Sequence, residues 1–181
     1  MERNNTMGFD LSGESPMINT ELSSYKLYGV IESIEDWKEQ RNLLDAMTSL
    51  DKEQYWNEYE SYHADNPGIY FRNNCWWWRP LWDYVCTNCA DIITIKDVNG
   101  GNYNDGHKIS KTKAKKISKK LYSLIAKGDV KKFEVEYEAE RLKLEESEDK
   151  DDKFSSHYPF SESNVKRFAE FCKQSGGFII C

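Results

Sequence analysis

Residues 75–85 read Cys-Trp-Trp-Trp-Arg-Pro-Leu-Trp-Asp-Tyr-Val, the densest aromatic run in the chain. Four of its apolar residues recur at the i, i+3, i+4 and i+7 spacing of one helix face: Trp78, Leu81, Trp82 and Val85. We place Pro80 in the first helical turn, where its missing N–H costs nothing, and Asn73 or Asn74 at the N-cap. The segment therefore predicts a helix that anchors the core with tryptophan.

The composition supports an aromatic core beneath a charged surface. Of the 181 residues, 14% are aromatic and 31% are charged, and the net charge is -6. Disordered chains are poor in aromatics, and each buried aromatic side chain removes about 150–250 Å² from water. The length corresponds to one domain or two small ones.

Other features predict a cytoplasmic protein without membrane contact. No run approaches the roughly 20 apolar residues that span a bilayer. The polar residues 1–5 precede no apolar stretch, so no signal peptide is visible. Five cysteines, with a single Cys-x-x-Cys pair among them, suit a reducing compartment.

Periodicity along the chain predicts an α+β fold dominated by helices, with about five helices and a few short strands. Residues 7–13 and 178–181 predict strands at the two ends of the chain, which we expect to pair with each other. Residues 97–107 predict a loop and residues 145–153 an acidic linker. We divide the chain into a tail with the first strand (1–13), a helical insertion (14–68) and a core (69–181).

Two long signatures carry a resemblance. One is Tyr-Phe-Arg-Asn-Asn-x-Trp-Trp-Trp-Arg-Pro-Leu-Trp-Asp-Tyr at residues 70–84, and the other is Phe-Ala-Glu-Phe-Cys-x-x-Ser-Gly-Gly-Phe-x-Ile-Cys at residues 168–181. Shorter segments at residues 7–13, 103–107 and 157–160 add to it. On these segments the chain resembles a family of small uncharacterised proteins encoded by bacteria and their phages. The family has no assigned activity.

Two departures from the family pattern matter. Similar proteins lack most of residues 14–68, which therefore look like an insertion. Many carry paired Cys-x-x-Cys knuckles where this chain has the acidic residues 145–153, so the family's zinc knuckle is not carried over. Met7 matches the usual start, so residues 1–6 look like an extension.

The tryptophan segment also carries candidate ligand-binding residues: Trp76, Trp77, Arg79 and the adjoining Arg72, Asn73 and Asn74. An aromatic ring beside a guanidinium suits stacking on a base and pairing with a phosphate. The segment therefore predicts a site for a nucleotide-like ligand. Core packing and helix capping are the alternative interpretation of the same residues.

Three further polar residues are candidates for proton transfer: Asp83, Asp105 and His157. A carboxylate with an imidazole is enough for general acid–base catalysis. These residues line one cleft if the resembling segments meet in space, although caps and turns explain most such residues. No Gly-x-Ser-x-Gly, P-loop or His-Glu-x-x-His motif is present, which favours a protein that is not an enzyme.

Cys86 and Cys89 supply two potential zinc ligands, whereas a structural zinc site needs four. The nearest additional candidates, Cys75 and His107, do not form a second pair. We therefore expect neither a metal nor a cofactor.

Charge is distributed unevenly along the chain. Residues 108–132 hold ten lysines and one aspartate, and residues 134–152 hold ten acidic and three basic side chains. A basic helix followed by an acidic one predicts an antiparallel hairpin whose charges face each other. The alternative is an exposed stripe, with Lys111, Lys115 and Lys119 on one helix face touching phosphates.

The insertion carries acidic, aromatic helices whose rings resemble hot spots for protein binding: Trp37, Tyr55, Trp56, Tyr59 and Tyr62. Packing in a core is the alternative for about half of them.

These features support three hypotheses of function. The leading one is a non-enzymatic, cytosolic binding protein of a phage or mobile element. It would occlude a host defence protein or sequester a nucleotide-like ligand. The runner-up is a small enzyme acting on a nucleotide or similar anionic metabolite, and the third is nucleic-acid binding through residues 108–132. The sequence leaves the oligomeric state open.

Overall fold

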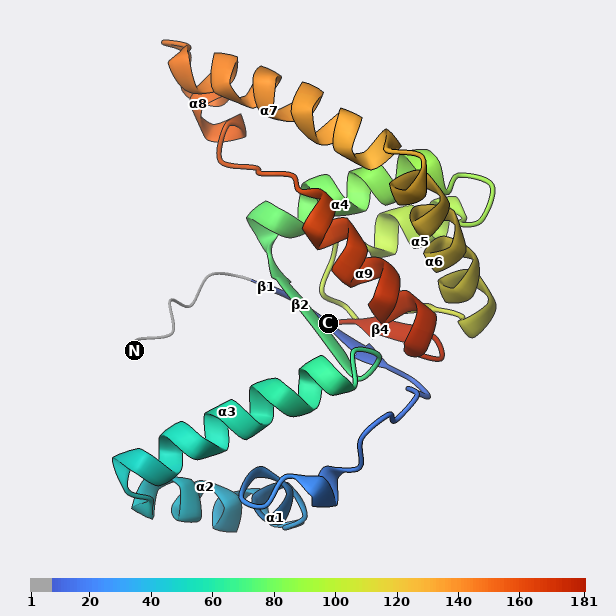
Figure 1. Cartoon of the computed structure of the whole chain (residues 1–181). Helices are drawn as coiled ribbons and strands as arrows, with labels where there is room; N and C mark the ends of the chain where they lie inside the picture. The colour runs from blue at the N-terminus through green and yellow to red at the C-terminus, as the bar shows by residue number, and fades with distance from the viewer. Residues whose placement is uncertain (1–7) are drawn as a thin grey trace. The chain divides into compact units, whose positions relative to one another are not determined.

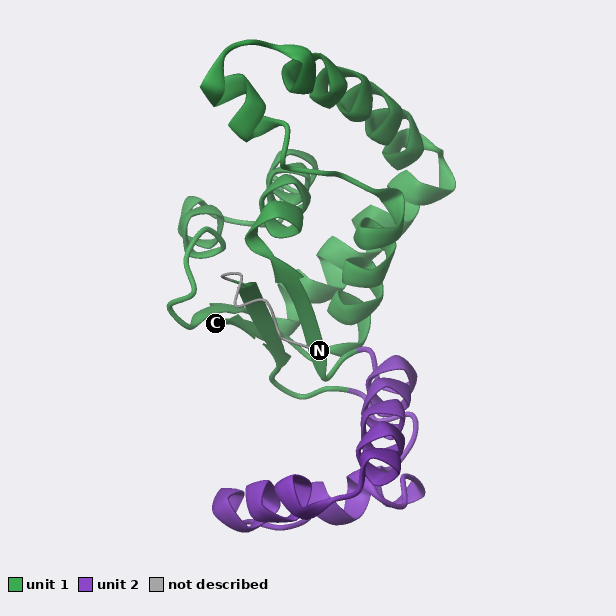
Figure 2. Cartoon of the chain, turned by 90° about the vertical axis from the view of Figure 1, so that its left-hand side faces the viewer, with its two compact units in different colours: residues 1–16, 68–181 green, residues 17–67 purple. Residues whose placement is uncertain are grey.

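The computed structural model describes residues 8–181, so the predicted tail and Met7 of the first expected strand lie outside the described residues. The described chain has the predicted α+β fold dominated by helices (Figure 1). It forms two compact units (Figure 2). Unit 1 comprises the chain up to Pro16 together with Gly68–Cys181, and unit 2 comprises Met17–Pro67.

Unit 1 holds all four strands of the described chain: β1 (Gly8–Gly13), β2 (Tyr70–Asn74), β3 (His107–Ile109) and β4 (Phe178–Ile180). Its helices are α4 (Cys75–Asn88), α5 (Ile95–Gly100), α6 (Lys111–Ala126), α7 (Asp129–Glu146), α8 (Lys150–Ser155) and α9 (Glu162–Gln174). Unit 2 holds a short 3-10 helix (Leu22–Ser24), α1 (Tyr28–Glu32), α2 (Trp37–Ala46) and α3 (Ser49–Asp65).

The strands form one antiparallel sheet in the order β2-β1-β4-β3. Leu11 of β1 lies opposite Phe71 of β2 on one side and Ile180 of β4 on the other. The predicted pairing of the two end strands is therefore confirmed. Phe9 and Leu11 are buried toward the helices, and the intervening residues of β1 are more exposed.

Two stacked tryptophans of α4 occupy the core of unit 1. Trp78 and Trp82 are completely buried, with ring centroids 5.3 Å apart. The indole N–H of Trp78 donates to the carbonyl of Gly101 at 2.7 Å, and that of Trp82 to the carbonyl of Val98 at 3.1 Å. Each large ring is thus buried without an unpaired donor, and α4 is tied to α5.

The predicted position of Pro80 is wrong. Asn74 caps α4, so the helix already begins at Cys75 and Pro80 lies in its second turn. There a proline removes one helical hydrogen bond, the one that would reach the carbonyl of Trp76.

The described chain has nine α-helices instead of about five. A capping box of Thr94 and Asp97 starts α5 inside the expected loop, and Asp149 caps α8 inside the expected acidic linker. Helices of five or six residues are too short to show an apolar period, which is why the pattern misses them.

The expected pairing of charges between α6 and α7 is also wrong. Within the described residues 8–181, no ion pair joins the two helices. The acidic residues of α7 pair with bases of the same helix three or four residues away, as Glu138 does with Arg141 at 2.7 Å. The buried side of α6 packs against α9.

Asp97 joins three elements of unit 1. The nearly fully buried carboxylate accepts hydrogen bonds from Thr94, from His107 of β3 at 3.0 Å and from Lys113 of α6. Burial alone would raise the pKa of Asp97, but the hydrogen bonds from Lys113 and Thr94 hold it well below its usual value.

Asn66 closes unit 2. Its fully buried side-chain oxygen accepts from the backbone N–H groups of Asn19 (2.7 Å) and Thr20 (3.1 Å). Its side-chain nitrogen donates to the carbonyls of Thr20 and Tyr62. One side chain thus holds the first and last turns of the unit together.

We predict that Asp97→Ala lowers the free energy of unfolding by about 3–5 kcal/mol at pH 7, because it leaves a lysine without its buried partner. The folded-state pKa of Asp97 lies below the unfolded value of about 3.9. Its stabilising contribution is therefore complete above about pH 5 and is lost as the pH falls below 4. Denaturant titrations of both proteins between pH 7 and 2 should show the difference shrinking. A difference independent of pH would contradict this role.

Candidate functional site

Three of the predicted ligand-binding residues have structural partners around β2. Arg72 lies opposite Asp10 across the sheet, with 3.5 Å between Nε and Oδ1. Asn73 is buried and donates to the side chain of Asn164 at 3.1 Å. Asn74 caps α4. These contacts account for all three residues without a ligand.

The adjacent tryptophans Trp76 and Trp77 have different surroundings. Trp76 is half-buried against the rings of Phe154, His157 and Tyr158, at centroid distances of 5.4, 5.6 and 4.8 Å. Trp77 is 36% exposed. The aromatic surface beside α4 is therefore built jointly with α8 and the residues that follow it.

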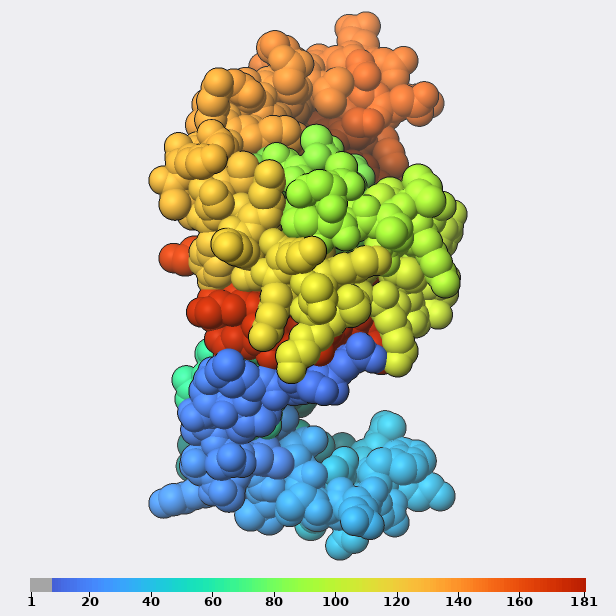
Figure 3. All heavy atoms as spheres, turned by 90° about the vertical axis from the view of Figure 1, so that its right-hand side faces the viewer, coloured from blue at the N-terminus to red at the C-terminus, as the bar shows by residue number. Residues whose placement is uncertain are grey.

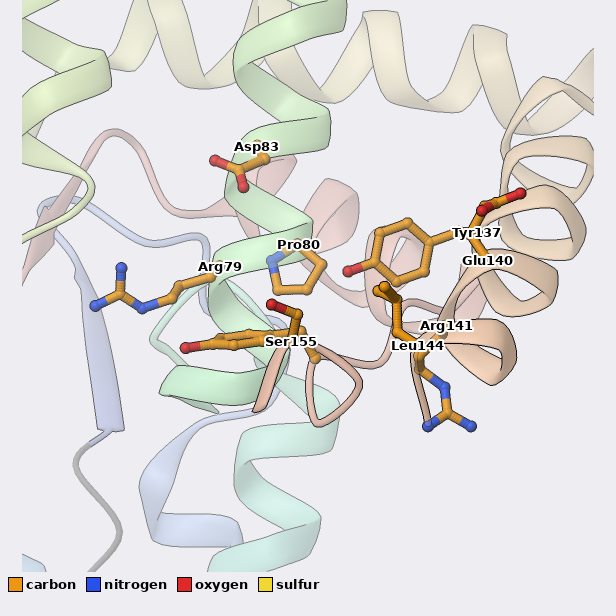
Figure 4. A pocket seen from close by; sticks show the side chains of 9 residues that line it. Arg79, Pro80, Asp83, Tyr137, Glu140, Arg141, Leu144 and Ser155 are labelled. Carbon is orange, nitrogen blue, oxygen red and sulfur yellow. The ribbon is translucent and has the colours of Figure 1, made fainter. Parts of the chain in front are cut away.

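Two adjoining cavities lie between α4 and α7, and we call them together the α4–α7 groove. The first, of about 300 Å³, is lined by Arg79, Pro80, Asp83, Tyr137, Glu140, Arg141, Leu144, Ser155 and Tyr158 (Figure 4). The second, of about 450 Å³, shares Pro80, Asp83 and Tyr137 with the first and continues along Tyr84, Asn88 and Phe133. The groove thus includes Arg79 and Asp83 of the sequence prediction, together with rings of α7 that the sequence did not indicate.

The groove has apolar walls and a charged rim. Figure 4 shows the Tyr137 ring beside Pro80, while the side chains of Arg79 and Arg141 lead away in different directions. Arg141 is bound to Glu138 at 2.7 Å and donates to the carbonyl of Ser156 at 3.0 Å. The two cations therefore do not converge on one anion, and the groove is better suited to an aromatic or apolar group.

Asp83 is the acidic residue common to both cavities. Partial withdrawal from water raises the pKa of its carboxyl, and the nearby charge of Arg79 opposes that shift. A carboxyl with a raised pKa is a candidate for proton transfer.

The structure does not bring the three candidate catalytic residues into one cavity. Asp83 lies in the α4–α7 groove, whereas His157 lines a separate cavity of about 440 Å³, with its Nδ1 2.8 Å from the carbonyl of Lys153. Asp105 is exposed in the segment before β3. Arg141 lines both the groove and the His157 cavity.

Cys86 and Cys89 lie one turn apart on α4. Burial raises the pKa of Cys86 to about 12 and that of Cys89 to about 11, so both thiols stay protonated at neutral pH. His107 is engaged by Asp97. Across residues 8–181, no three His, Cys, Asp or Glu side chains are grouped so as to hold a metal ion.

Part of the aromatic set of unit 2 forms the core of that unit. Tyr28 is surrounded by Tyr55, Tyr59 and Tyr62, each at a centroid distance of 5.5 Å. Tyr55 is only 4% exposed. A carboxylate oxygen of Glu58 accepts the N–H groups of Leu27 and Tyr28 at the start of α1.

The remaining apolar residues of unit 2 are exposed. We call the following side chains its exposed apolar set: Met17, Ile18, Val30, Trp37, Leu43, Leu50 and Trp56. Trp37 is 63% exposed and Leu50 is 75% exposed. The sequence indicated only the two tryptophans as contact residues. Because Leu43 and Leu50 fit a helical apolar period, the pattern alone could not show that they face solvent.

No protein-family model, no curated protein and no solved structure matches the chain. The resemblance to small phage and bacterial proteins therefore stays a prediction. No helix in the described part of the chain is long and apolar enough to cross a membrane.

We predict that Asp83→Asn leaves the free energy of unfolding at pH 7 within about 0.5 kcal/mol of wild type, or raises it. The pKa of Asp83 is raised in the folded state, so its ionised form opposes folding, unlike that of Asp97. Denaturation at pH 7 and an NMR titration of the carboxyl carbon test the two parts. A depressed pKa, or a clear loss of stability, would sink the assignment.

Proposed function

We propose that the protein is a non-enzymatic binding protein that occludes a protein partner through unit 2. The observation that carries the proposal is the exposed apolar set on a unit whose buried core consists of four residues: Tyr25, Tyr28, Ile31 and Tyr55. Exposed apolar side chains of this size mark interaction sites when they gather on one small unit. Tryptophan is enriched among residues that dominate binding energy.

The charge of unit 2 specifies the chemistry of the partner. Residues 17–67 hold eleven acidic and four basic side chains, so unit 2 supplies more than the whole net charge of -6. A partner with basic residues around apolar pockets complements this surface. In line with the resemblance to phage proteins, we propose a host defence protein that binds nucleic acid as the partner, with acidic side chains standing in for phosphates.

We predict that Trp37→Ser with Trp56→Ser weakens binding of the partner by at least about 30-fold, the loss typical of two-kcal hot spots. The wild-type chain is used to recover proteins from a host lysate. Each recovered protein is then purified, and its affinity for the wild type and the variant is measured by calorimetry. Tyr55, Tyr59 and Tyr62 are left intact because they pack in or against the core of unit 2.

The matched control is Val135→Ser with Leu142→Ser on α7, which removes two similarly exposed apolar side chains from unit 1. It should bind as the wild type does. Failure to recover any host protein, or equal affinities for the wild type and the unit 2 variant, would refute the proposal.

The second candidate function is binding of a nucleotide-like ligand in the α4–α7 groove, with or without turnover. A cavity of about 300 Å³ with two tyrosine rings and Arg79 at its rim favours it. The divergence of Arg79 and Arg141 makes it the weaker candidate.

We predict that, if this function exists, Tyr137→Ala weakens a bound nucleoside phosphate at least about tenfold, because it removes a stacking surface. Arg72→Ala, which lies on the sheet outside the groove, should have no effect. Calorimetry with a panel of nucleoside phosphates measures binding, and turnover lost in Asp83→Asn would assign an enzyme. Absence of binding across the panel rules out this candidate.

A further inference from the structure

Helix α6 carries six lysines and no acidic residue. Its buried side, which packs against α9, consists of Ala114, Ile117, Ser118 and Leu121. The residues opposite that side are exposed and mostly basic. Figure 3 shows residues of α6 and of the segment before it, in yellow, as a continuous part of the surface of unit 1.

Most of these lysines have no acidic partner. Lys113 is bound to Asp97, and Lys108, just before the helix, is bound to Glu14 at 2.8 Å. The other lysines between residues 108 and 127 make no ion pair with any described residue: Lys111, Lys115, Lys116, Lys119, Lys120 and Lys127. All six are exposed. We call them the lysine face.

Stability does not explain the lysine face. Like charges at i, i+4, such as Lys111 with Lys115 and Lys116 with Lys120, destabilise a helix, and lysines in its first turn oppose the helix dipole. Solubility would be served equally by mixed charges, as on α7, where acids and bases form ion pairs at i, i+3 and i, i+4. A face of one sign that costs stability is expected where it binds the opposite charge.

We propose that the lysine face binds the phosphate backbone of a double-stranded nucleic acid without reading its sequence. At 1.5 Å per residue, the stretch from Lys111 to Lys127 spans about 24 Å. That length corresponds to about seven base pairs of duplex. Lysine presents a point charge on a flexible stem, which suits phosphates and carries no sequence information.

Two observations favour a duplex over other polyanions. Single-strand binding uses exposed aromatic rings, but the aromatic residue of α6, Tyr122, is half-buried and donates to Glu170. A helix lying on a membrane buries an apolar face in lipid, whereas the apolar face of α6 is covered by α9. The net charge of -6 does not oppose this, because 21 basic and 20 acidic side chains lie outside unit 2.

The experiment measures binding of the full chain to labelled 20-base-pair DNA of two unrelated sequences, to duplex RNA and to single-stranded DNA. Fluorescence anisotropy is recorded between 50 and 300 mM NaCl. We expect equal affinity for the two DNA sequences and a slope of log K against log salt of about -4.5, the value for five phosphate contacts. The DNA and RNA arms identify which duplex is preferred.

The diagnostic variant is Lys115→Gln, Lys116→Gln and Lys119→Gln, which should weaken duplex binding at least tenfold at 50 mM salt and reduce the slope by about 2.7. The control is Lys131→Gln, Lys132→Gln and Lys143→Gln on α7, whose lysines already have acidic partners. It should leave both quantities nearly unchanged. Circular dichroism of both variants should match the wild type, since the exchanged lysines make no ion pairs within α6.

The proposal is overturned by absence of duplex binding at 50 mM salt, or by equal losses in the two triple variants. Tighter binding to single strands, or to vesicles of 30% phosphatidylserine in phosphatidylcholine, overturns it as well. The Trp37→Ser, Trp56→Ser protein should bind duplex as the wild type does, so this outcome is separate from the test of unit 2.

Discussion

The fold of unit 1 depends on the interior position of β1 in the sheet. This strand begins the described chain, yet it pairs with β2 about 60 residues later and with β4 at the end of the chain. The backbone groups of Asp10 and Cys181 exchange two hydrogen bonds, of 2.8 and 2.7 Å. Only when both neighbours are in place do Phe9 and Leu11 form a continuous surface for α4 and α9. The tryptophan pair and the groove beside it are therefore consequences of long-range strand pairing.

The parts of this structure that could be predicted are those encoded locally. The period of Trp78, Leu81, Trp82 and Val85 sets one face of a helix whatever surrounds it, and α4 follows. Trp76 and Trp77 are chemically identical and adjacent, yet their exposure is decided by α8, some 75 residues away. The same holds for the groove, whose second wall comes from α7. Ion pairing was mispredicted because partners three or four residues apart within α7 outcompete partners on α6.

Opposite charges are separated within the chain, so the small net charge conceals two distinct surfaces. Unit 2 is acidic and exposes large apolar side chains, while the lysine face of α6 lies in unit 1, which is nearly neutral overall. The two surfaces suit different partners: a basic protein for one and a phosphate backbone for the other. A protein that binds nucleic acid in the host offers both chemistries, its own basic surface and the polyanion that it carries. The two proposals are independent in their tests and compatible in a single complex.

The closure of unit 2 by Asn66 has a kinetic consequence for the whole chain. Pairing β1 with β2 requires closing a loop of more than 50 residues, and the entropic cost of closure grows with the logarithm of loop length. If unit 2 folds first, the hydrogen bonds from Asn66 to residues 19 and 20 bring the two ends of that loop close together. The strands then meet as though joined by a short connection, which saves about 2 kcal/mol of loop entropy. Early folding of unit 2 would therefore speed assembly of the sheet, and a long insertion need not slow it.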